Sequence, residues 1–265
     1  MGVSRRLLFG STLWQVARPA TTLTPGHLTI RLSDPAVAFD SSSAADWLRC
    51  YRAAHAALSE VFAARTFCLF FAHQWHPFGA ALAEPEAESS TPTFHLFGRF
   101  SGESTTPGQQ LALPAHRRVP LTAVELQKYD GGLRRALQRA AAIRGTDGPS
   151  NTGTPFTGAS ADVPPSTSLI TRTEPDPPAG PHHTVLSPGR GVSSVGALLP
   201  EELLAMAAAL QQTADLGTVN GLSCVVAEGP DTGQLELHAV ARSAGEAFNP
   251  LARLLDSPKV SQALL

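Results

Sequence analysis

A stretch of low-complexity sequence divides the chain into two parts that differ sharply from it in composition. Between residues 145 and 181 the sequence is dominated by Gly, Ser, Thr and Pro, and it holds eight of the 22 prolines of the chain. Large apolar side chains are nearly absent there, so the stretch cannot bury enough surface to offset the entropy that ordering would cost. We therefore predict a disordered linker over 145–181, with a folded segment on each side of it.

The segment from 1 to 100 has the pattern of a small α+β unit. Alternating or short apolar runs predict strands at 13–17, 27–32, 67–71 and 94–100. A helix is predicted near 44–64, because its apolar positions recur at helical spacing and hydroxyl residues at 41–43 can cap it. Residues 101–144 then form a connecting segment with a basic helix at 122–143, which we interpret as a solvated helix face.

The segment from 182 to 265 repeats this order of elements. Strands are predicted at 182–186, 222–226 and 235–242, and a helix opens at Pro200, which is followed by two acids. The last strands of the two units match most closely. In both, an apolar residue precedes a histidine (His95, His238), and two apolar residues, a small residue and an arginine (Arg99, Arg242) follow it. This match predicts an internal duplication; the alternative is a coincidence of composition between two αβ units.

The order of elements resembles the histidine-triad (HIT)/galactose-1-phosphate uridylyltransferase (GalT) superfamily. Residues 185–192 and 199–203 look like the superfamily's strand with a Pro-containing turn and its helix start of two acids and a leucine, and 220–229 looks like its middle strand. The resemblance implies an α+β fold of two HIT-like half-modules, each an antiparallel sheet packed by a helix. Tandem copies imply an intramolecular pseudo-dimer, in which joined sheets would remove two exposed strand edges.

The final strand departs from the superfamily pattern, which places three histidines at alternate positions. Counted back from the arginine, His95 and His238 take the third position, and Thr93 and Glu236 stand two residues before them. Counted instead from Pro92, His95 takes the second position, which in active members attacks the α-phosphate. Neither alignment gives a complete triad, so the active site is predicted to be degenerate.

Attack on phosphorus needs a neutral imidazole whose second nitrogen is held by a partner, together with donors for the charge on the phosphate oxygens. His95 alone cannot supply this set, whereas histidines in the adjoining loop could complete it. We therefore predict His95, His76 and His73 as catalytic residues, and Arg99, Gln74, His238 and Arg242 as substrate-binding residues.

The resemblance implies a nucleotide-phosphate hydrolase or nucleotidyltransferase that acts through a histidine on a nucleotide or sugar-nucleotide. The alternative is a catalytically degenerate nucleotide-binding or scaffold protein with the same fold, and a third possibility is an unrelated α/β protein. No cofactor and no metal are predicted.

Each candidate residue also has an ordinary structural interpretation. His95 is then a strand histidine with one backbone partner, and Arg99 and Arg242 form salt bridges at strand ends. The spacing of His73 and His76 is compatible with zinc, although no third ligand stands at a fixed spacing. The pair at 182–183 is interpreted as a solvated turn.

Charge and hydropathy exclude other classes of function. The net charge is −2 and only 16% of residues are charged, so no global field favours nucleic acid or an anionic membrane. No apolar run approaches the roughly 20 residues that span a bilayer, and we expect a cytoplasmic protein without a membrane partner. Cys50, Cys68 and Cys224 are predicted to be buried, reduced thiols. Whether the arginines near residue 5 form a targeting signal, and the oligomeric state, stay open.

Overall fold

The computed structural model describes residues 7–75, 82–88, 92–143, 168–243, 246 and 249–265. Within this part of the chain, nine strands form one antiparallel sheet with the order β1-β2-β3-β5-β4-β8-β9-β7-β6. The strands are β1 (Leu7–Gly10), β2 (Trp14–Ala17), β3 (His27–Leu32), β4 (Thr66–His73), β5 (Thr93–Arg99), β6 (Ile170–Thr173), β7 (Thr184–Pro188), β8 (Gly221–Glu228) and β9 (Leu237–Arg242). The helices are α1 (Ser41–Phe62), α2 (Pro107–Leu111), α3 (Ala123–Ile143), α4 (Pro200–Ala214), α5 (Pro250–Leu255) and α6 (Pro258–Leu264). The α+β class is confirmed.

The centre of the sheet is the antiparallel pair β4–β8, where segments from the two sides of the predicted linker meet. Phe70 lies opposite Val225 in this pair. On their other edges, Phe70 lies opposite His95 of β5 and Val225 opposite His238 of β9. Reading outward, β4 is followed by β5, β3 and β2, and β8 by β9, β7 and β6, so the two sides have the same order of strands.

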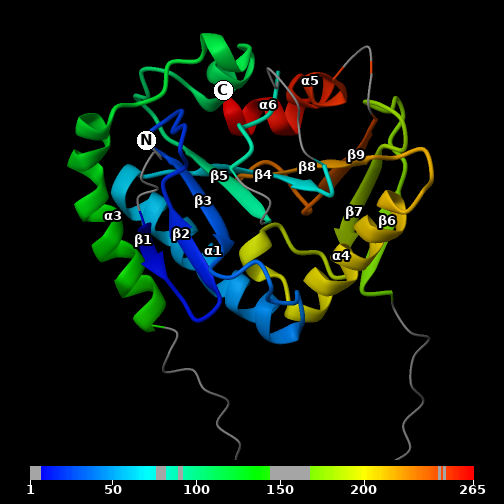
Figure 1. The fold of residues 1–265 in the computed structure, drawn as a ribbon, viewed down its shortest axis with the longest axis horizontal. Coiled ribbons are helices and arrows are strands. Elements are labelled where there is room, and N and C mark those ends of the chain that lie inside the picture. The colour runs from blue at the N-terminus through cyan, green and yellow to red at the C-terminus, as the bar shows by residue number, and fades with distance from the viewer. Residues whose placement is uncertain (1–6, 76–81, 89–91, 144–167, 244–245, 247–248) are drawn as a thin grey trace, which may run out of the picture.

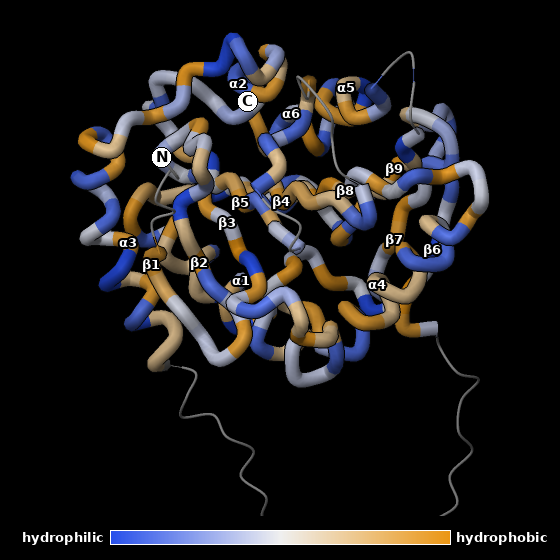
Figure 2. The backbone as a smooth tube through the Cα atoms, viewed as in Figure 1, coloured by the Kyte–Doolittle hydropathy of each residue, from blue (hydrophilic) through white to orange (hydrophobic). Residues whose placement is uncertain are grey.

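Alternation along the strands sends side chains to two different layers (Figure 1). One face, here called the helix face, buries Leu69, Leu96 and Cys224 against α1 and α4, and α3 packs beside them on α1 and β1. The other, here called the histidine face, buries Cys68 and Phe97 against α5 and α6. The strands at the centre are hydrophobic along most of their length, because both of their faces are covered (Figure 2).

The helices begin where the local sequence satisfies their first backbone N–H groups. At α1 the side chain of Asp40 accepts a hydrogen bond from the Ser43 N–H (2.8 Å), so this helix starts three residues before the predicted position. At α4, Glu202 accepts from the Leu199 N–H (2.8 Å) and is held by Arg190. The helix begins at Pro200, as predicted.

The elements that sequence patterns did not predict are short. They are β1, β6, α2, α5 and α6, and each has at most seven residues. β6 falls inside the predicted linker. It is a strand because its backbone pairs with β7, although most of its side chains are exposed. Residues 145–167 of the predicted linker lie outside the described residues. An edge strand of exposed polar residues carries no apolar periodicity, so composition alone could not reveal it.

The remaining general predictions concern the thiols and the membrane. All three cysteines are free and buried, as predicted, and burial raises the pKa of the Cys50 thiol to about 11. Cys68 and Cys224 lie on opposite faces of the sheet and are therefore not equivalent. None of the helices in the described part of the chain combines the length and hydrophobicity that crossing a membrane requires.

Candidate functional site

A cavity of about 590 Å³ lies where β4 ends and β5 begins. It reaches both faces of the sheet: Met206 and Leu210 of α4 line it on the helix face, whereas His95 and Ser223 line it on the histidine face. Its volume is in the range of pockets that hold small organic ligands. The described residues that line it are mostly apolar or aromatic, and none of them is Arg or Lys.

His95 is buried in this cavity wall and is bonded to a second histidine on the neighbouring strand. The Nε2 atom of His27 lies 3.1 Å from the Nδ1 atom of His95. His27 also stacks on Phe97, with ring centroids 4.0 Å apart. Burial lowers the pKa of His95 to about 3. Burial also lowers the pKa of His27, and repulsion from the nearby positive groups lowers it further. Both imidazoles are therefore neutral at physiological pH.

The hydrogen bonds assign the tautomer of each ring. The backbone N–H of Leu23 donates to Nδ1 of His27 (3.2 Å), so this nitrogen carries the lone pair and Nε2 carries the proton. His27 therefore donates to Nδ1 of His95. It follows that His95 carries its own proton on Nε2, which has no hydrogen-bond partner among the described residues.

The other side of the sheet contains the same chain of bonds. The Ala179 N–H donates to Nδ1 of His183 (3.0 Å), and Nε2 of His183 lies 3.1 Å from Nδ1 of His238. The ring centroids are 5.3 Å apart in both pairs. On this side the second imidazole, that of His238, faces a carboxylate. Glu236 lies 3.7 Å from Nε2 of His238 and pairs with Lys259 (2.7 Å).

Two of these histidines escaped the sequence interpretation. His183 was predicted to lie in a solvated turn, which is wrong: it is only 5% exposed and is bonded to His238. His27 was not predicted as a site residue. A signal was present, since both histidines stand two residues after a proline and at the head of a strand that pairs with the strand of His95 or His238.

His73 lines the same cavity but on the opposite face of the sheet from His95. Its Nε2 lies 3.2 Å from Oε1 of Gln211 on α4, and Gln74 donates to the same oxygen (2.9 Å). The structure therefore brings His73 and Gln74 together but separates them from the His27–His95 pair by the thickness of the sheet. His76 lies outside the described residues.

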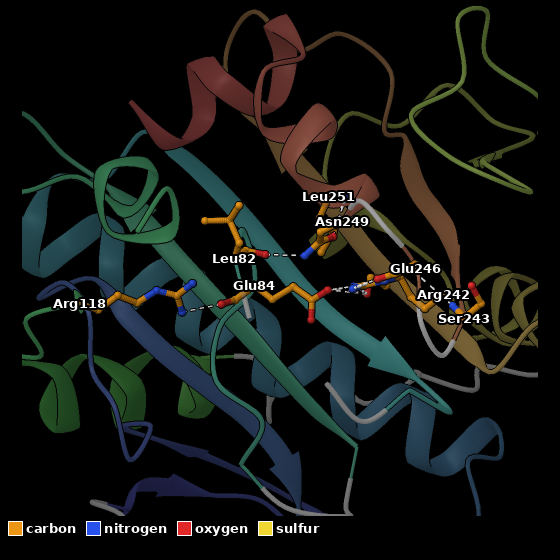
Figure 3. A network of polar contacts seen from close by, with 9 residues as sticks. Leu82, Glu84, Arg118, Arg242, Ser243, Glu246, Asn249 and Leu251 are labelled. Atoms are coloured by element: carbon orange, nitrogen blue, oxygen red, sulfur yellow. Dashed lines mark hydrogen bonds and ion pairs between the residues drawn. The ribbon is translucent and has the colours of Figure 1, made fainter. Parts of the chain in front are cut away.

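Arg242 lies beside the cavity and is fully engaged by protein groups (Figure 3). It forms ion pairs with Glu84 and Glu246, donates to Ser223 (2.8 Å), and lies over the Trp75 ring at 4.8 Å. Arg242 and Glu84 are each 5% exposed. This network ties β9 to residues 82–88, and it neutralises the charge that a phosphate would need.

Arg99 lies away from the cavity, at the far end of β5. It stands four positions after His95 along the extended strand, a distance of about 13 Å. Its guanidinium donates to the backbone oxygens of Phe100 and Leu265 and lies 3.9 Å from Glu103. Arg99 and Arg242 thus occupy matching strand positions but have unlike surroundings, and the salt-bridge interpretation describes both.

The described part of the chain contains no group of three or more His, Cys, Asp or Glu residues arranged to hold a metal ion. The zinc interpretation of His73 therefore has no further ligand within these residues.

Solved structures with this architecture identify the class of fold. No family model and no curated protein matches the chain. A GalT-like protein from Arabidopsis thaliana superposes with a TM-score of 0.50 at 11% identity, covering 92% of this chain and 81% of that one. The chain therefore shares the fold of this GalT-like protein, which agrees with the fold that the resemblance implied. The yeast Ap4A phosphorylase in complex with Ap4A also matches, with a TM-score of 0.35 and 14% identity, and covers 91% of this chain; this chain spans 61% of the phosphorylase.

Proposed function

We propose that this chain is a nucleotide-class binding protein that uses the HIT/GalT-like fold without nucleotidyl transfer. In this proposal His95 donates a hydrogen bond to the ligand from Nε2. The observation that carries it is the chain of bonds from the Leu23 N–H through His27 to His95, since a nitrogen that carries a proton has no lone pair with which to attack phosphorus.

Restoring a lone pair on Nε2 of His95 would disturb the whole chain of bonds. The proton would have to move to Nδ1, where it would face the proton on Nε2 of His27. If His27 changed its tautomer as well, its Nδ1–H would face the buried N–H of Leu23. Each of these arrangements leaves a buried donor unpaired, which costs about 1–3 kcal/mol. The geometry therefore favours binding over covalent catalysis.

The lining of the cavity supports a ligand with little negative charge there. The described lining residues contribute two carboxylates, Glu84 and Glu88, and no lysine or arginine. Arg242, which lies beside the cavity, is already paired with two carboxylates. A nucleoside or mononucleotide suits such a wall better than a polyphosphate, whose charges need basic partners.

We also propose that the two sides of the sheet derive from one duplicated unit and form an intramolecular pseudo-dimer. The shared strand order and the two matching imidazole pairs support this origin. In that case the units are 1–100 and 182–265. The surroundings of the two equivalent imidazoles, His95 and His238, have diverged. His95 lines the cavity, whereas His238 faces Glu236.

Titration calorimetry and a turnover assay on one panel test the binding proposal. We expect adenosine or AMP to bind the wild-type chain, and no cleavage of ATP, Ap4A or UDP-glucose above background. His95→Phe keeps a ring but removes the donor, so affinity should fall about 3- to 10-fold. The matched control is His116→Phe at an exposed histidine, which should change nothing. Turnover that disappears in His95→Phe would instead establish the predicted transferase or hydrolase, and absence of both binding and turnover would refute the binding proposal.

The tautomers are open to direct measurement. In protein labelled with ¹⁵N-histidine, we expect His27 and His95 to carry their proton on Nε2 at pH 7.5, with Nδ1 at the shift of an unprotonated nitrogen. His183 and His238 should behave in the same way. A proton on Nδ1 of His95 would return the lone pair to Nε2 and with it the nucleophile.

A further inference from the structure

The part of the cavity on the helix face forms an aromatic chamber, separate from the imidazole pair on the histidine face. Its walls come from β2, β4, β5, the loop after β3 and helix α4. The residues that define it are Trp14, Val37, Phe39, Phe71, Phe94, Leu203, Met206 and Leu210. Trp14 and Phe94 meet edge to face with centroids 5.8 Å apart, and Phe71 and Phe94 lie 4.9 Å apart. Flat apolar rings pack well among such partners.

His73 is one of the polar residues that line the cavity on this face, and residues of α4 assign its tautomer. The amide of Gln211 donates from Nε2 to the carboxylate of Asp215 (2.6 Å), which can only accept. Oε1 of Gln211 therefore points toward His73 and accepts a hydrogen bond from the Nε2–H group of that ring. Nδ1 of His73 is left with a lone pair and has no hydrogen-bond partner among the described residues.

The backbone around His73 is held in an unusual conformation that keeps this arrangement in place. Gln74 has a positive φ of 54°, which non-glycine residues seldom adopt. Its amide bonds to Gln211 (2.9 Å), and its backbone packs against Gly221, where an added Cβ would approach the Gln74 carbonyl carbon to 2.6 Å. Strain of this kind persists where the surroundings enforce it, and it is common at binding sites.

We infer that the helix-face chamber takes an uncharged heteroaromatic group and that Nδ1 of His73 accepts a hydrogen bond from an N–H of that group. Gln211 and Asp215 act as positioning residues, because they reach the ligand only through the tautomer of His73. The inference rests on the proposed function for the identity of the ligand class. It adds a second recognition point on the opposite face of the sheet from His95, so one ligand would meet a donor on one face and an acceptor on the other.

The test compares adenosine with purine riboside, which lacks the exocyclic amino group, by calorimetry at pH 8. The wild-type chain should bind adenosine about 3- to 10-fold more tightly, as expected for one hydrogen bond. His73→Phe should remove this preference while it retains weaker binding of both ligands. Gln211→Leu should reduce the preference, since it releases the tautomer of His73, whereas Gln211→Glu should preserve it. The matched control is Gln212→Leu, at the exposed neighbouring position of α4.

The outcomes separate this inference from the proposed function. Equal affinity for the two ligands in the wild-type chain, or a preference that survives in His73→Phe, would overturn the role of His73 and leave the binding proposal intact. Absence of binding of either ligand to the wild-type chain would overturn both.

Discussion

Replacing Arg242 with methionine is expected to lower the free energy of unfolding by about 3–5 kcal/mol, because it strands a buried carboxylate. Glu84 is 5% exposed and faces Arg242 and the Ser223 hydroxyl, which donates to it (3.0 Å). Without the Arg242 guanidinium, the Glu84 carboxylate loses its ion-pair partner and keeps the Ser223 hydroxyl as a neutral donor, while Arg118 donates to the Glu84 backbone oxygen (2.6 Å). Urea denaturation monitored by circular dichroism measures the difference.

Arg99→Met is the matched control, since Arg99 holds the same place in the strand motif. Its side chain is 24% exposed, and the side chain of its partner Glu103, 3.9 Å away, is buried with a pKa that burial raises to about 7. Glu103 can therefore become neutral when the guanidinium is removed, and the expected loss is about 1 kcal/mol. The double variant Arg242→Met with Glu84→Leu should recover much of the stability, because both buried charges are then absent. Equal losses in the two single variants would mean that the network around Arg242 contributes no more than a strand-end salt bridge.

Acidification should destabilise the protein steeply between about pH 6.5 and pH 3. Burial lowers the pKa of His95 to about 3, and the pKa of His27 is also lowered, whereas both groups titrate near 6.5 when unfolded. As pH falls through this window, the unfolded state binds protons that the folded state refuses. The contribution of these imidazoles to the free energy of unfolding is therefore complete above the pKa of the unfolded state. It is lost as the pH falls toward the pKa of the folded state, at about 1.4 kcal/mol per pH unit for each such imidazole.

The double variant His27→Gln with His95→Gln isolates this contribution. Other groups titrate in the same window: His183, whose pKa burial lowers to about 4, acts in the same direction, and Glu103, whose pKa burial raises to about 7, acts in the opposite one. In the double variant, the slope of the free energy of unfolding against pH should thus be smaller than in the wild-type chain by the contribution of two imidazoles. His116→Gln, at an exposed position, should leave the slope unchanged. An unaltered slope in the double variant would contradict neutral, buried imidazoles.

Most of the long elements were predictable because their patterns are local. Short apolar runs or alternation predict the strands β3, β4, β5, β8 and β9. Helical spacing and caps predict the helices α1, α3 and α4. The α+β class, and the resemblance that led to the fold shared with the GalT-like protein, followed from the order of these elements. Short pieces such as β6 and α5 were missed, because a few residues at an edge or a surface do not produce a measurable period.

The site was predicted only in part, because its partners are distant in sequence. His73, Gln74 and His95 do line one cavity, but the alternation of β4 and β5 places His73 and His95 on opposite faces. That relation depends on the register of the two strands, which the sequence of neither strand contains. The prediction that His95 attacks phosphorus needed a proton position that depends on His27, a residue 68 positions away.

The sequence by itself determined the α+β class and the main elements, since periodicity and turn residues act over a few positions. Only the tertiary structure decided which atoms of the histidines are free. Hydrogen-bond partners such as Leu23, Gln211 and Asp215 assign those protons, and they come together through strand pairing and helix packing. A single imidazole can donate or accept depending on its neighbours, so chemistry at this site is a property of the assembled sheet and not of the motif.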